Sequence, residues 1–235
     1  MTVPLYVFDA YGTLFDVHSA IGRHRQRVGP QAERLSELWR AKQLEYTWVR
    51  SLMGAYQDFD ALTEQALDYA TARCGGMSPD TRAVLLDAYR RLDPFRDAAP
   101  ALARLRAKGA HCVILSNGTP EGLACAVASA GLSAWLDESL SVDALKIFKT
   151  APQAYELVGR RYGVEPSEVC FQSSNRWDIA GAKKFGFRTN WINREGAPNE
   201  YGDLAPDSVL TSLEDLNYSA LTGLRGFKAW AKLSD

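Results

Sequence analysis

The chain has 235 residues, a formal net charge of −1 and an ordinary globular composition, in which 46% of the residues are hydrophobic and 23% are charged. This length suffices for one large core, or for a core domain with a smaller second domain. The near-neutral charge argues against a broad nucleic-acid or anionic-membrane surface, and no apolar run approaches the roughly 20 residues of a membrane span.

The N-terminal part of the chain predicts one strand followed by a helical region. An apolar run at residues 5–8 is typical of a buried strand, and a carboxylate follows it directly. Over residues 31–56 apolar side chains recur at close to helical spacing, and a Ser-Pro pair opens a predicted helix over 79–92. Because residues 16–95 contain no convincing strand, the sequence predicts an all-helical insert after the first strand.

Strands and helices alternate in the rest of the chain. The segments 112–115, 169–171 and 187–192 are apolar enough to predict further strands. Helix-like segments lie before and between them, and a glycine, which readily ends a helix, follows each one. These segments span residues 99–108, 119–130 and 152–162.

This order of elements favours an α/β fold in which a Rossmann-like, mainly parallel sheet forms the core and an all-helical cap domain is inserted. We expect the core domain to comprise residues 1–15 and 96–235, and the cap domain to comprise residues 16–95. An insert at this point can cover the carboxyl ends of the strands, where open α/β sheets bind their ligands.

Polar side chains follow three of the predicted strands. Because parallel strands bring their carboxyl ends to one edge, two carboxylates, a lysine and several hydroxyl and amide groups are expected to converge there. Each residue alone has an ordinary alternative role as a turn former, helix cap or surface side chain. The set comprises Asp9, Tyr11, Thr13, Ser116, Asn117, Lys149, Tyr155, Ser173, Asn175 and Asp178.

This pattern resembles the haloacid dehalogenase superfamily over essentially the whole chain. Most members are Mg²⁺-dependent phosphatases with a second Asp where this chain has Tyr11, and with an acidic pair where it has 173–175. Phosphoryl transfer needs that second Asp as a proton donor and needs more carboxylates around the metal. A halide leaves as a weakly basic anion without a proton, so the departures favour halide displacement by Asp9.

Four segments are similar to the L-2-haloacid dehalogenase subfamily: FDAYGTLFDVHS, LWRAKQLEYTWVRSLM, ILSNG and SSNRWDIAGAKKFGF. The resemblance implies that Asp9 attacks C2 of a short 2-haloalkanoic acid, an L-2-haloacid or a haloacetate, with inversion and with no metal or other cofactor. Water then releases the 2-hydroxy acid from the aspartyl ester. The resemblance implies that Asp178 orients and deprotonates this water, assisted by Ser173 and Asn175, and that Thr13 holds the network.

The same resemblance implies binding roles. Lys149 would serve near the carboxylates alongside Ser116 and backbone amides, and Tyr155 would hold the Lys149 region in place. Arg40, from the helical insert, would face the halide together with Asn117; its alternative role is that of a solvated helix residue. Apolar walls would exclude water from C2, although ordinary core packing is an equal explanation for each of Tyr11, Leu44, Phe59 and Trp177.

Several positions depart from the subfamily pattern. Ala41 stands where Gln is common beside the arginine, and Thr150-Ala151 replaces a Pro-Asp pair after the lysine. Gln172 replaces an apolar residue, and Arg176 replaces a small one. These changes would alter the size and polarity of the pocket, so they leave the preferred substrate open.

Two other function classes remain open at this stage. A Mg²⁺-dependent small-molecule phosphatase would keep the Asp nucleophile, but the residue at position 11 argues against it. A non-catalytic binding protein could keep the fold, although such a scaffold does not require Asp9, Lys149 and Asp178 together.

Cysteine usage bears on location. The four cysteines contain no CxxC pair and are predicted to be free thiols, which favours a reducing, cytoplasmic setting. The N-terminus has no basic region, so no signal peptide is expected. The expected partners are the 2-haloacid and its halide, without nucleic acid or membrane. The aromatic-rich segment 39–56 either forms a homodimer interface, common in the subfamily, or packs on the core.

Overall fold

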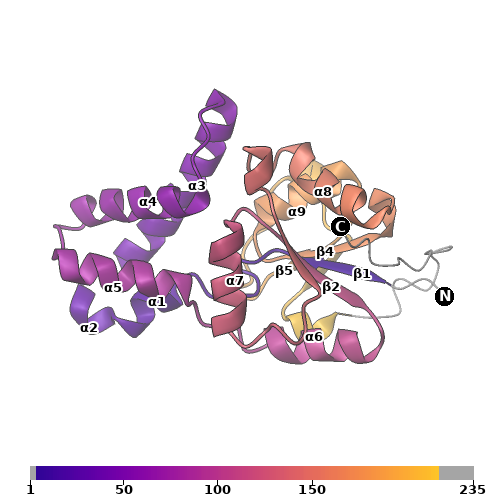
Figure 1. Cartoon of the computed structure of the whole chain (residues 1–235), viewed down its shortest axis with the longest axis horizontal. Helices are drawn as coiled ribbons and strands as arrows, with labels where there is room; N and C mark the ends of the chain where they lie inside the picture. The colour runs from indigo at the N-terminus through magenta and orange to yellow at the C-terminus, as the bar shows by residue number, and fades with distance from the viewer. Residues whose placement is uncertain (1–3, 217–235) are drawn as a thin grey trace, which may run out of the picture.

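A six-stranded parallel sheet forms the centre of the molecule in the computed structural model, which describes residues 4–216 (Figure 1). The strand order is β3-β2-β1-β4-β5-β6, so the first strand lies between two later ones. The strands are β1 (Leu5–Phe8), β2 (His111–Ser116), β3 (Glu138–Ser141), β4 (Val169–Ser173), β5 (Arg188–Ile192) and β6 (Ser208–Leu210). All four side chains of β1 are buried, as expected for a central parallel strand covered on both faces.

Helices cover both faces of this sheet. α8 and α9 pack against each other on one side, and α6 lies on the opposite side (Figure 1). The helices of this part are α6 (Ala98–Ala107), α7 (Pro120–Ser129), α8 (Pro152–Tyr162) and α9 (Arg176–Phe185). Short 3₁₀ turns complete the connections at η1 (Asp143–Leu145), η2 (Pro166–Glu168), η3 (Gly202–Leu204) and η4 (Leu213–Asp215).

Five helices follow β1 and lie to one side of the sheet, with the end of α3 projecting away from the rest (Figure 1). α3 packs along α4, and α1 contacts α5. Side-chain caps start two of these helices: Asp58 accepts a hydrogen bond from Ala61, and Ser78 accepts one from Thr81. The five are α1 (Ser19–Arg23), α2 (Arg25–Val28), α3 (Ala32–Met53), α4 (Phe59–Arg73) and α5 (Pro79–Arg90).

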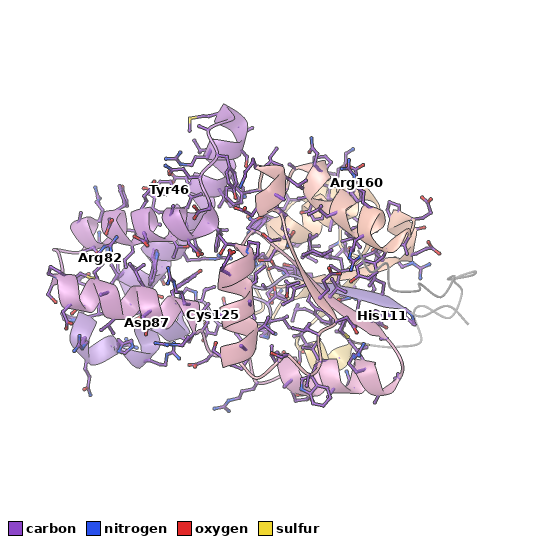
Figure 2. The ribbon with its side chains drawn as sticks, viewed as in Figure 1. Tyr46, Arg82, Asp87, His111, Cys125 and Arg160 are labelled. Carbon is purple, nitrogen blue, oxygen red and sulfur yellow. The ribbon has the colours of Figure 1, made fainter. Side chains whose placement is uncertain are left out.

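The outer faces of these helices carry charged side chains, such as Arg82 and Asp87 on α5 (Figure 2). Arg82 pairs with Asp68 of α4 and thereby ties the two helices together at the surface. None of the described helices is both long enough and apolar enough to cross a bilayer.

The predicted α/β fold is confirmed, and the four predicted strands correspond to β1, β2, β4 and β5. The sequence did not predict β3 and β6. β3 (ESLS) contains no apolar run, and β6 has only three residues at the edge of the sheet. Backbone pairing with a neighbouring strand, rather than side-chain periodicity, makes both segments extended.

Candidate functional site

The candidate site lies where β1, β2 and β4 end. The register pairs Phe8 with Ile114 and Gln172, which brings the residues after all three strands to one edge of the sheet. The chain turns sharply after Asp9, and Gly12 adopts φ +91°, a left-handed conformation that favours glycine. This turn directs the Thr13 side chain back towards Asp9.

The two carboxylate oxygens of Asp9 have different surroundings. Oδ2 accepts hydrogen bonds from Thr13 Oγ1 at 3.0 Å, Ser173 Oγ at 3.3 Å and Asn175 Nδ2 at 2.7 Å. Both hydroxyls also accept from backbone amides, those of Ser174 and Asn175, which leaves their protons for Asp9. Within residues 4–216, Oδ1 accepts only from Lys149 Nζ at 3.1 Å.

Lys149 joins the two predicted carboxylates. Its ammonium is fully buried and lies 3.1 Å from Asp9 Oδ1 and 2.9 Å from Asp178 Oδ2. Burial disfavours the charged form, but the two carboxylates more than offset this effect, so the pKa of Lys149 is raised. Its backbone N–H donates to Asn117 Oδ1 at 2.9 Å, which fixes the loop that carries it.

Asp178 lies in the first turn of α9 and is fully buried. Its Oδ1 accepts a 2.8 Å hydrogen bond from the Tyr155 hydroxyl, which thus contacts the lysine region through Asp178. Burial raises the pKa of Asp178 to about 6, against the opposing pull of Lys149 and with help from the Asp9 charge. A carboxylate with such a pKa can act as a general base near neutral pH.

Arg40 reaches the site from α3. Its Nη2 donates to the Tyr11 carbonyl at 3.1 Å and to Asn175 Oδ1 at 3.3 Å. Asn117 Oδ1 accepts from the Lys149 backbone, and no hydrogen bond joins Asn117 to Arg40 within the described chain, so the halide role predicted for the two residues stays a prediction. Ser173 and Asn175 both donate hydrogen bonds to Asp9, and their predicted assistance to Asp178 stays a prediction.

Aromatic side chains close one side of the site. Tyr11 is buried, and its ring centroid lies 5.1 Å from that of Phe59 and 5.9 Å from that of Tyr89. Gly118 allows this packing, because a Cβ there would lie 2.8 Å from the Tyr11 ring. Ser116, also predicted for the site, is buried and accepts from the Gly118 amide.

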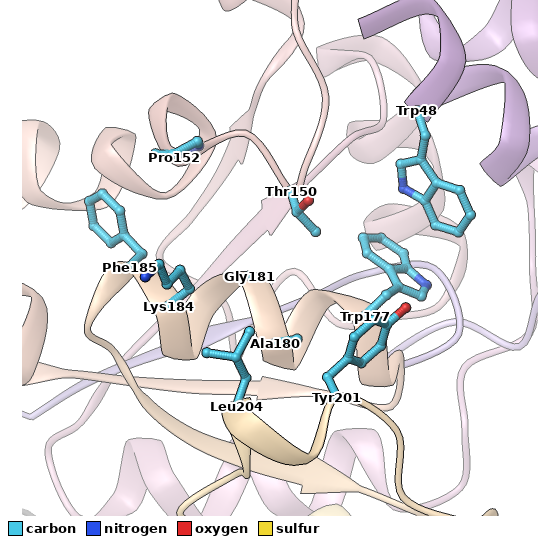
Figure 3. A pocket seen from close by; sticks show the side chains of 10 residues that line it. All are labelled: Trp48, Thr150, Pro152, Trp177, Ala180, Gly181, Lys184, Phe185, Tyr201 and Leu204. Carbon is cyan, nitrogen blue, oxygen red and sulfur yellow. The ribbon is translucent and has the colours of Figure 1, made fainter. Parts of the chain in front are cut away.

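Besides a cavity of about 280 Å³ that Lys149 and Trp48 line, two larger cavities border the site. One of about 340 Å³ lies between α3 and the core, and Arg40, Leu44, Asn175 and Trp177 line it together with loop residues. A larger cavity of about 570 Å³ lies along α9 and is mainly apolar, and neither Asp9 nor Lys149 lines it (Figure 3). Trp177 borders both cavities, and its ring packs edge-on against that of Trp48 at 5.5 Å.

Two of the residues that depart from the subfamily pattern, Gln172 and Arg176, point away from Asp9. Arg176 donates to Asn199 Oδ1 and to the carbonyls of Tyr201 and Leu204, so it anchors the loop after β5. Gln172 is fully buried, and its amide nitrogen lies 3.0 Å from the Cys170 sulfur.

Sequence reasoning missed a buried network of three residues, Gln43, Thr63 and Tyr89, of which Gln43 contacts Arg40. Gln43 accepts from Arg40 Nη1 at 2.9 Å and from the Tyr89 hydroxyl at 3.0 Å, and it donates to Thr63 Oγ1 at 2.6 Å. A signal was available, because Gln43 falls on the same helical stripe as Trp39. A polar residue on the apolar face of a helix is a sign of a buried hydrogen-bond network.

Known proteins resemble this chain closely. A family model described as haloacid dehalogenase-like hydrolase matches residues 3–186. The chain is 48% identical over 211 residues to (S)-2-haloacid dehalogenase 1 of Pseudomonas sp. (strain CBS-3), covering 89% of this chain and 93% of the relative. It is 49% identical over 213 residues to (S)-2-haloacid dehalogenase 4A of Burkholderia cepacia, covering 89% and 91%.

A solved structure supports the same comparison. The L-2-haloacid dehalogenase from Xanthobacter autotrophicus with chloropropionic acid covalently bound superposes with a TM-score of 0.85 at 38% identity. The match covers 95% of this chain and 100% of that one.

Proposed function

The chain belongs to the haloacid dehalogenase-like hydrolase family, and from this premise we propose that it hydrolyses short 2-haloalkanoic acids, namely L-2-haloacids and haloacetates, to 2-hydroxy acids. One observation carries the proposal. The buried carboxylate of Asp9 has one oxygen held by three donors, while the other accepts only from Lys149 among the described residues.

In the first step, Asp9 Oδ1 attacks C2 of the substrate. Three donors occupy the lone pairs of Oδ2, whereas Oδ1 keeps a lone pair for the new C–O bond. The C–halogen bond breaks as that bond forms, and its electron pair leaves with the halide. Attack opposite the leaving group inverts C2, and no proton is needed for departure.

Charged and apolar groups receive the substrate. Arg40 faces the halide together with Asn117, and Ser116 with backbone amides receives the substrate carboxylate. Tyr11, Leu44, Phe59 and Trp177 form the apolar walls. Water excluded from C2 by these walls cannot compete with Asp9 or screen the charges.

In the second step, water attacks Cγ of the Asp9 ester. Asp178 takes the water proton, and the donors on Oδ2, namely Thr13, Ser173 and Asn175, stabilise the negative charge that develops on this carbonyl oxygen, while Lys149 contacts the ester oxygen Oδ1. The intermediate then collapses to the 2-hydroxy acid and a restored Asp9 carboxylate. The departing alkoxide takes the proton held by Asp178, and the remaining proton goes to solvent.

We propose that neither step requires a metal or other cofactor. Lys149 lies between Asp9 and Asp178, where a cation shared by the two carboxylates would otherwise bind. Within residues 4–216, no group of three or more His, Cys, Asp or Glu side chains is arranged to hold a metal ion.

Halide release from L-2-chloropropionate tests this proposal. The wild-type enzyme should release halide at the same rate in excess EDTA as with added Mg²⁺, and Asp9→Ala should lose about 10⁴-fold or more in rate, as removal of a nucleophile does elsewhere. No halide release from any short 2-haloacid, together with Mg²⁺-dependent hydrolysis of a phosphate ester, would instead indicate a phosphatase.

We also propose two domains, a core of residues 1–15 and 96–235 and a cap of residues 16–95. The helices α1–α5 all fall within the cap, and all six strands fall within the core. Residues 1–3 and 217–235 of the proposed core lie outside the described part of the chain. Limited proteolysis should cut first near positions 16 and 95, and primary cuts inside α3 or α4 would contradict this division.

A homodimer is a further proposal, formed through the projecting end of α3. Val49, Leu52 and Met53 are apolar there, with 44%, 89% and 62% of their surfaces exposed. Beside them, Trp48 lines the apolar cavity along α9, whose far wall includes Phe185 (Figure 3). Clustered exposed apolar groups mark interaction surfaces, so we assign this surface to a second copy of the chain.

Light scattering during size-exclusion chromatography tests the dimer. The wild-type chain should have twice its monomer mass, and Leu52→Asp with Met53→Asp should restore the monomer. Val209→Asp, at an exposed site on β6, is the control and should stay dimeric. A wild-type monomer, or a dimer unchanged by the α3 substitutions, would contradict the assignment.

A cytoplasmic location completes the proposal. All four cysteines are free, and burial raises the pKa values of Cys112 and Cys170 to about 12. Free thiols suit a reducing compartment. Cell fractionation should recover the protein in the cytoplasmic fraction, and recovery from an oxidising compartment would contradict it.

A further inference from the structure

Gln43 is a fully buried polar side chain in the helical part of the molecule, on the face of α3 that packs against α4. Burying an amide is unfavourable unless its hydrogen bonds are satisfied. Gln43 meets this requirement with contacts to three different helices, since Arg40 lies on α3, Thr63 on α4 and Tyr89 on α5.

The hydrogen-bond donors and acceptors around Gln43 can be assigned in only one consistent way. The Thr63 hydroxyl donates to the Phe59 carbonyl at 2.7 Å, so its oxygen is left to accept from Gln43 Nε2. The amide orientation is then fixed, and Oε1 must face the other two partners. Both of these are donors, namely Arg40 Nη1 at 2.9 Å and the Tyr89 hydroxyl at 3.0 Å.

Arg40 is held entirely by neutral acceptors. Beyond Gln43 Oε1, its partners are the Tyr11 carbonyl and Asn175 Oδ1, and within residues 4–216 it forms no ion pair with a carboxylate. Neutral oxygens fix the plane of the guanidinium without cancelling its charge. The full positive charge therefore remains available to an anion that enters the site.

We propose that Gln43 is a positioning residue for Arg40: with Thr63 and Tyr89 it fixes the guanidinium at the halide position and leaves the charge unneutralised. The proposal rests on the proposed function, in which Arg40 receives the halide. Gln43 itself does not touch the substrate, so its effect passes through halide affinity rather than through the nucleophile.

Two substitutions of Gln43 separate the effect of anchoring Arg40 from the effect of leaving the charge of Arg40 unpaired. Gln43→Glu keeps the shape and the acceptor but pairs a carboxylate with Arg40, so halide affinity should fall by at least about tenfold, the effect of one charge-assisted hydrogen bond. Gln43→Met keeps the volume and leaves Arg40 charged but unanchored, so the loss should be smaller, about threefold.

Milder variants keep the test valid if those two fold poorly. Thr63→Val preserves shape but removes the acceptor that orients the amide, and Tyr89→Phe removes one donor while keeping the ring that stacks on Tyr11. Thr63→Val should weaken halide binding because the Gln43 amide can then rotate. Gln65→Glu places the same new charge on α4 away from Arg40 and is the matched control.

The measurement is competitive inhibition by sodium bromide during turnover of L-2-chloropropionate, with sodium sulfate used to keep ionic strength constant. A second reading, free of turnover, is the rise in melting temperature that bromide produces. Wild type and Gln65→Glu should give the same bromide inhibition constant. Gln43→Glu should raise that constant most, and its melting temperature should respond least to bromide.

The possible outcomes test the proposed function and the positioning role of Gln43 separately. If the wild type releases no halide from 2-haloacids, the proposed function fails. If the wild type turns over but the folded Gln43 variants keep its bromide inhibition constant, the positioning role fails. A loss of kcat and melting temperature with an unchanged bromide response would mean that Gln43 is only a structural residue, and would also overturn the inference.

Discussion

Asp9, Lys149 and Asp178 form a buried cluster with two negative charges and one positive charge. Such clusters seldom stabilise a fold, because desolvation of each ion costs as much as their attraction returns. The remaining negative charge is shared by hydroxyl and amide donors around Asp9. Because this arrangement is energetically unfavourable, it indicates a catalytic role for the cluster rather than a stabilising one.

Asp178 gives the sharpest prediction at this scale. Asp178→Asn keeps the shape and an oxygen for Tyr155, but it cannot take a proton from water. The ester should therefore form and persist, and intact-mass measurement after incubation with L-2-chloropropionate should show one added propionate unit on Asp9. The exposed Asp80→Asn is the control and should return to its unmodified mass. An unmodified Asp178→Asn protein would contradict the assigned base.

The raised pKa of Asp178 fixes a pH dependence. A base works only when unprotonated, so the hydrolysis rate should fall about tenfold per pH unit below the pKa of Asp178 and level off above it; this pKa is about 6 with Asp9 charged and is lowered once Asp9 is an uncharged ester. Because the pKa of Lys149 is raised, no loss is expected on the alkaline side until beyond its usual range. Single-turnover rates across pH measure this. A profile with its midpoint near 3.8, the ordinary Asp value, would contradict it.

At the scale of elements, α9 carries Asp178 and also allows α8 to pack closely against it. Gly181 leaves room for Tyr155, since a Cβ there would lie 2.4 Å from the Tyr155 hydroxyl oxygen and 2.9 Å from Thr150 Cβ. Gly181→Ala should therefore displace Tyr155, lower stability by about 1–3 kcal/mol as overpacking does, and slow ester hydrolysis.

Denaturant unfolding and single-turnover kinetics measure these effects. Gly22→Ala is the control, because nothing lies within 4 Å of the Cβ it would add, and Ala is the better helix former. It should leave stability unchanged or slightly higher. A Gly181→Ala variant as stable and as fast as Gly22→Ala would contradict the role given to this contact.

Much of the arrangement of elements was predictable from local pattern. Apolar runs identified β1, β2, β4 and β5, and the Ser78 cap marked the start of α5. The polar segment β3 was not predictable, because its strand form depends on pairing with β2. Edge strands of this kind are formed by tertiary context, which no window of sequence contains.

The residues that form the site were easier to predict from the sequence than the hydrogen bonds among them. The order of the strands brings Asp9, Lys149 and Asp178 together, so the topology alone predicts that these residues lie close to one another. Which oxygen each donor contacts depends on side-chain geometry, so the hydrogen bonds of Ser173 and Asn175 to Asp9 could not be deduced.

At the scale of the whole molecule, the site depends on the contact between the helical insert and the sheet. Arg40 crosses this boundary to Asn175, and Thr119 at the start of α7 donates to Asp60 on α4. Tyr56 donates to Asp143 at 2.5 Å farther along the same boundary. These hydrogen bonds join the two parts, and because the net charge of the chain is only −1, an anionic substrate is attracted by local charges rather than by the whole surface.

In the proposed reaction, Asp9 itself makes the new bond to carbon. A single turnover in ¹⁸O water with enzyme in excess over L-2-chloropropionate tests it most directly. If Asp9 attacks C2, the 2-hydroxy acid should carry ordinary oxygen from Asp9, and ¹⁸O should appear in the peptide containing Asp9. Label in the product hydroxyl, with none in that peptide, would mean that water attacks C2 directly and would contradict the account.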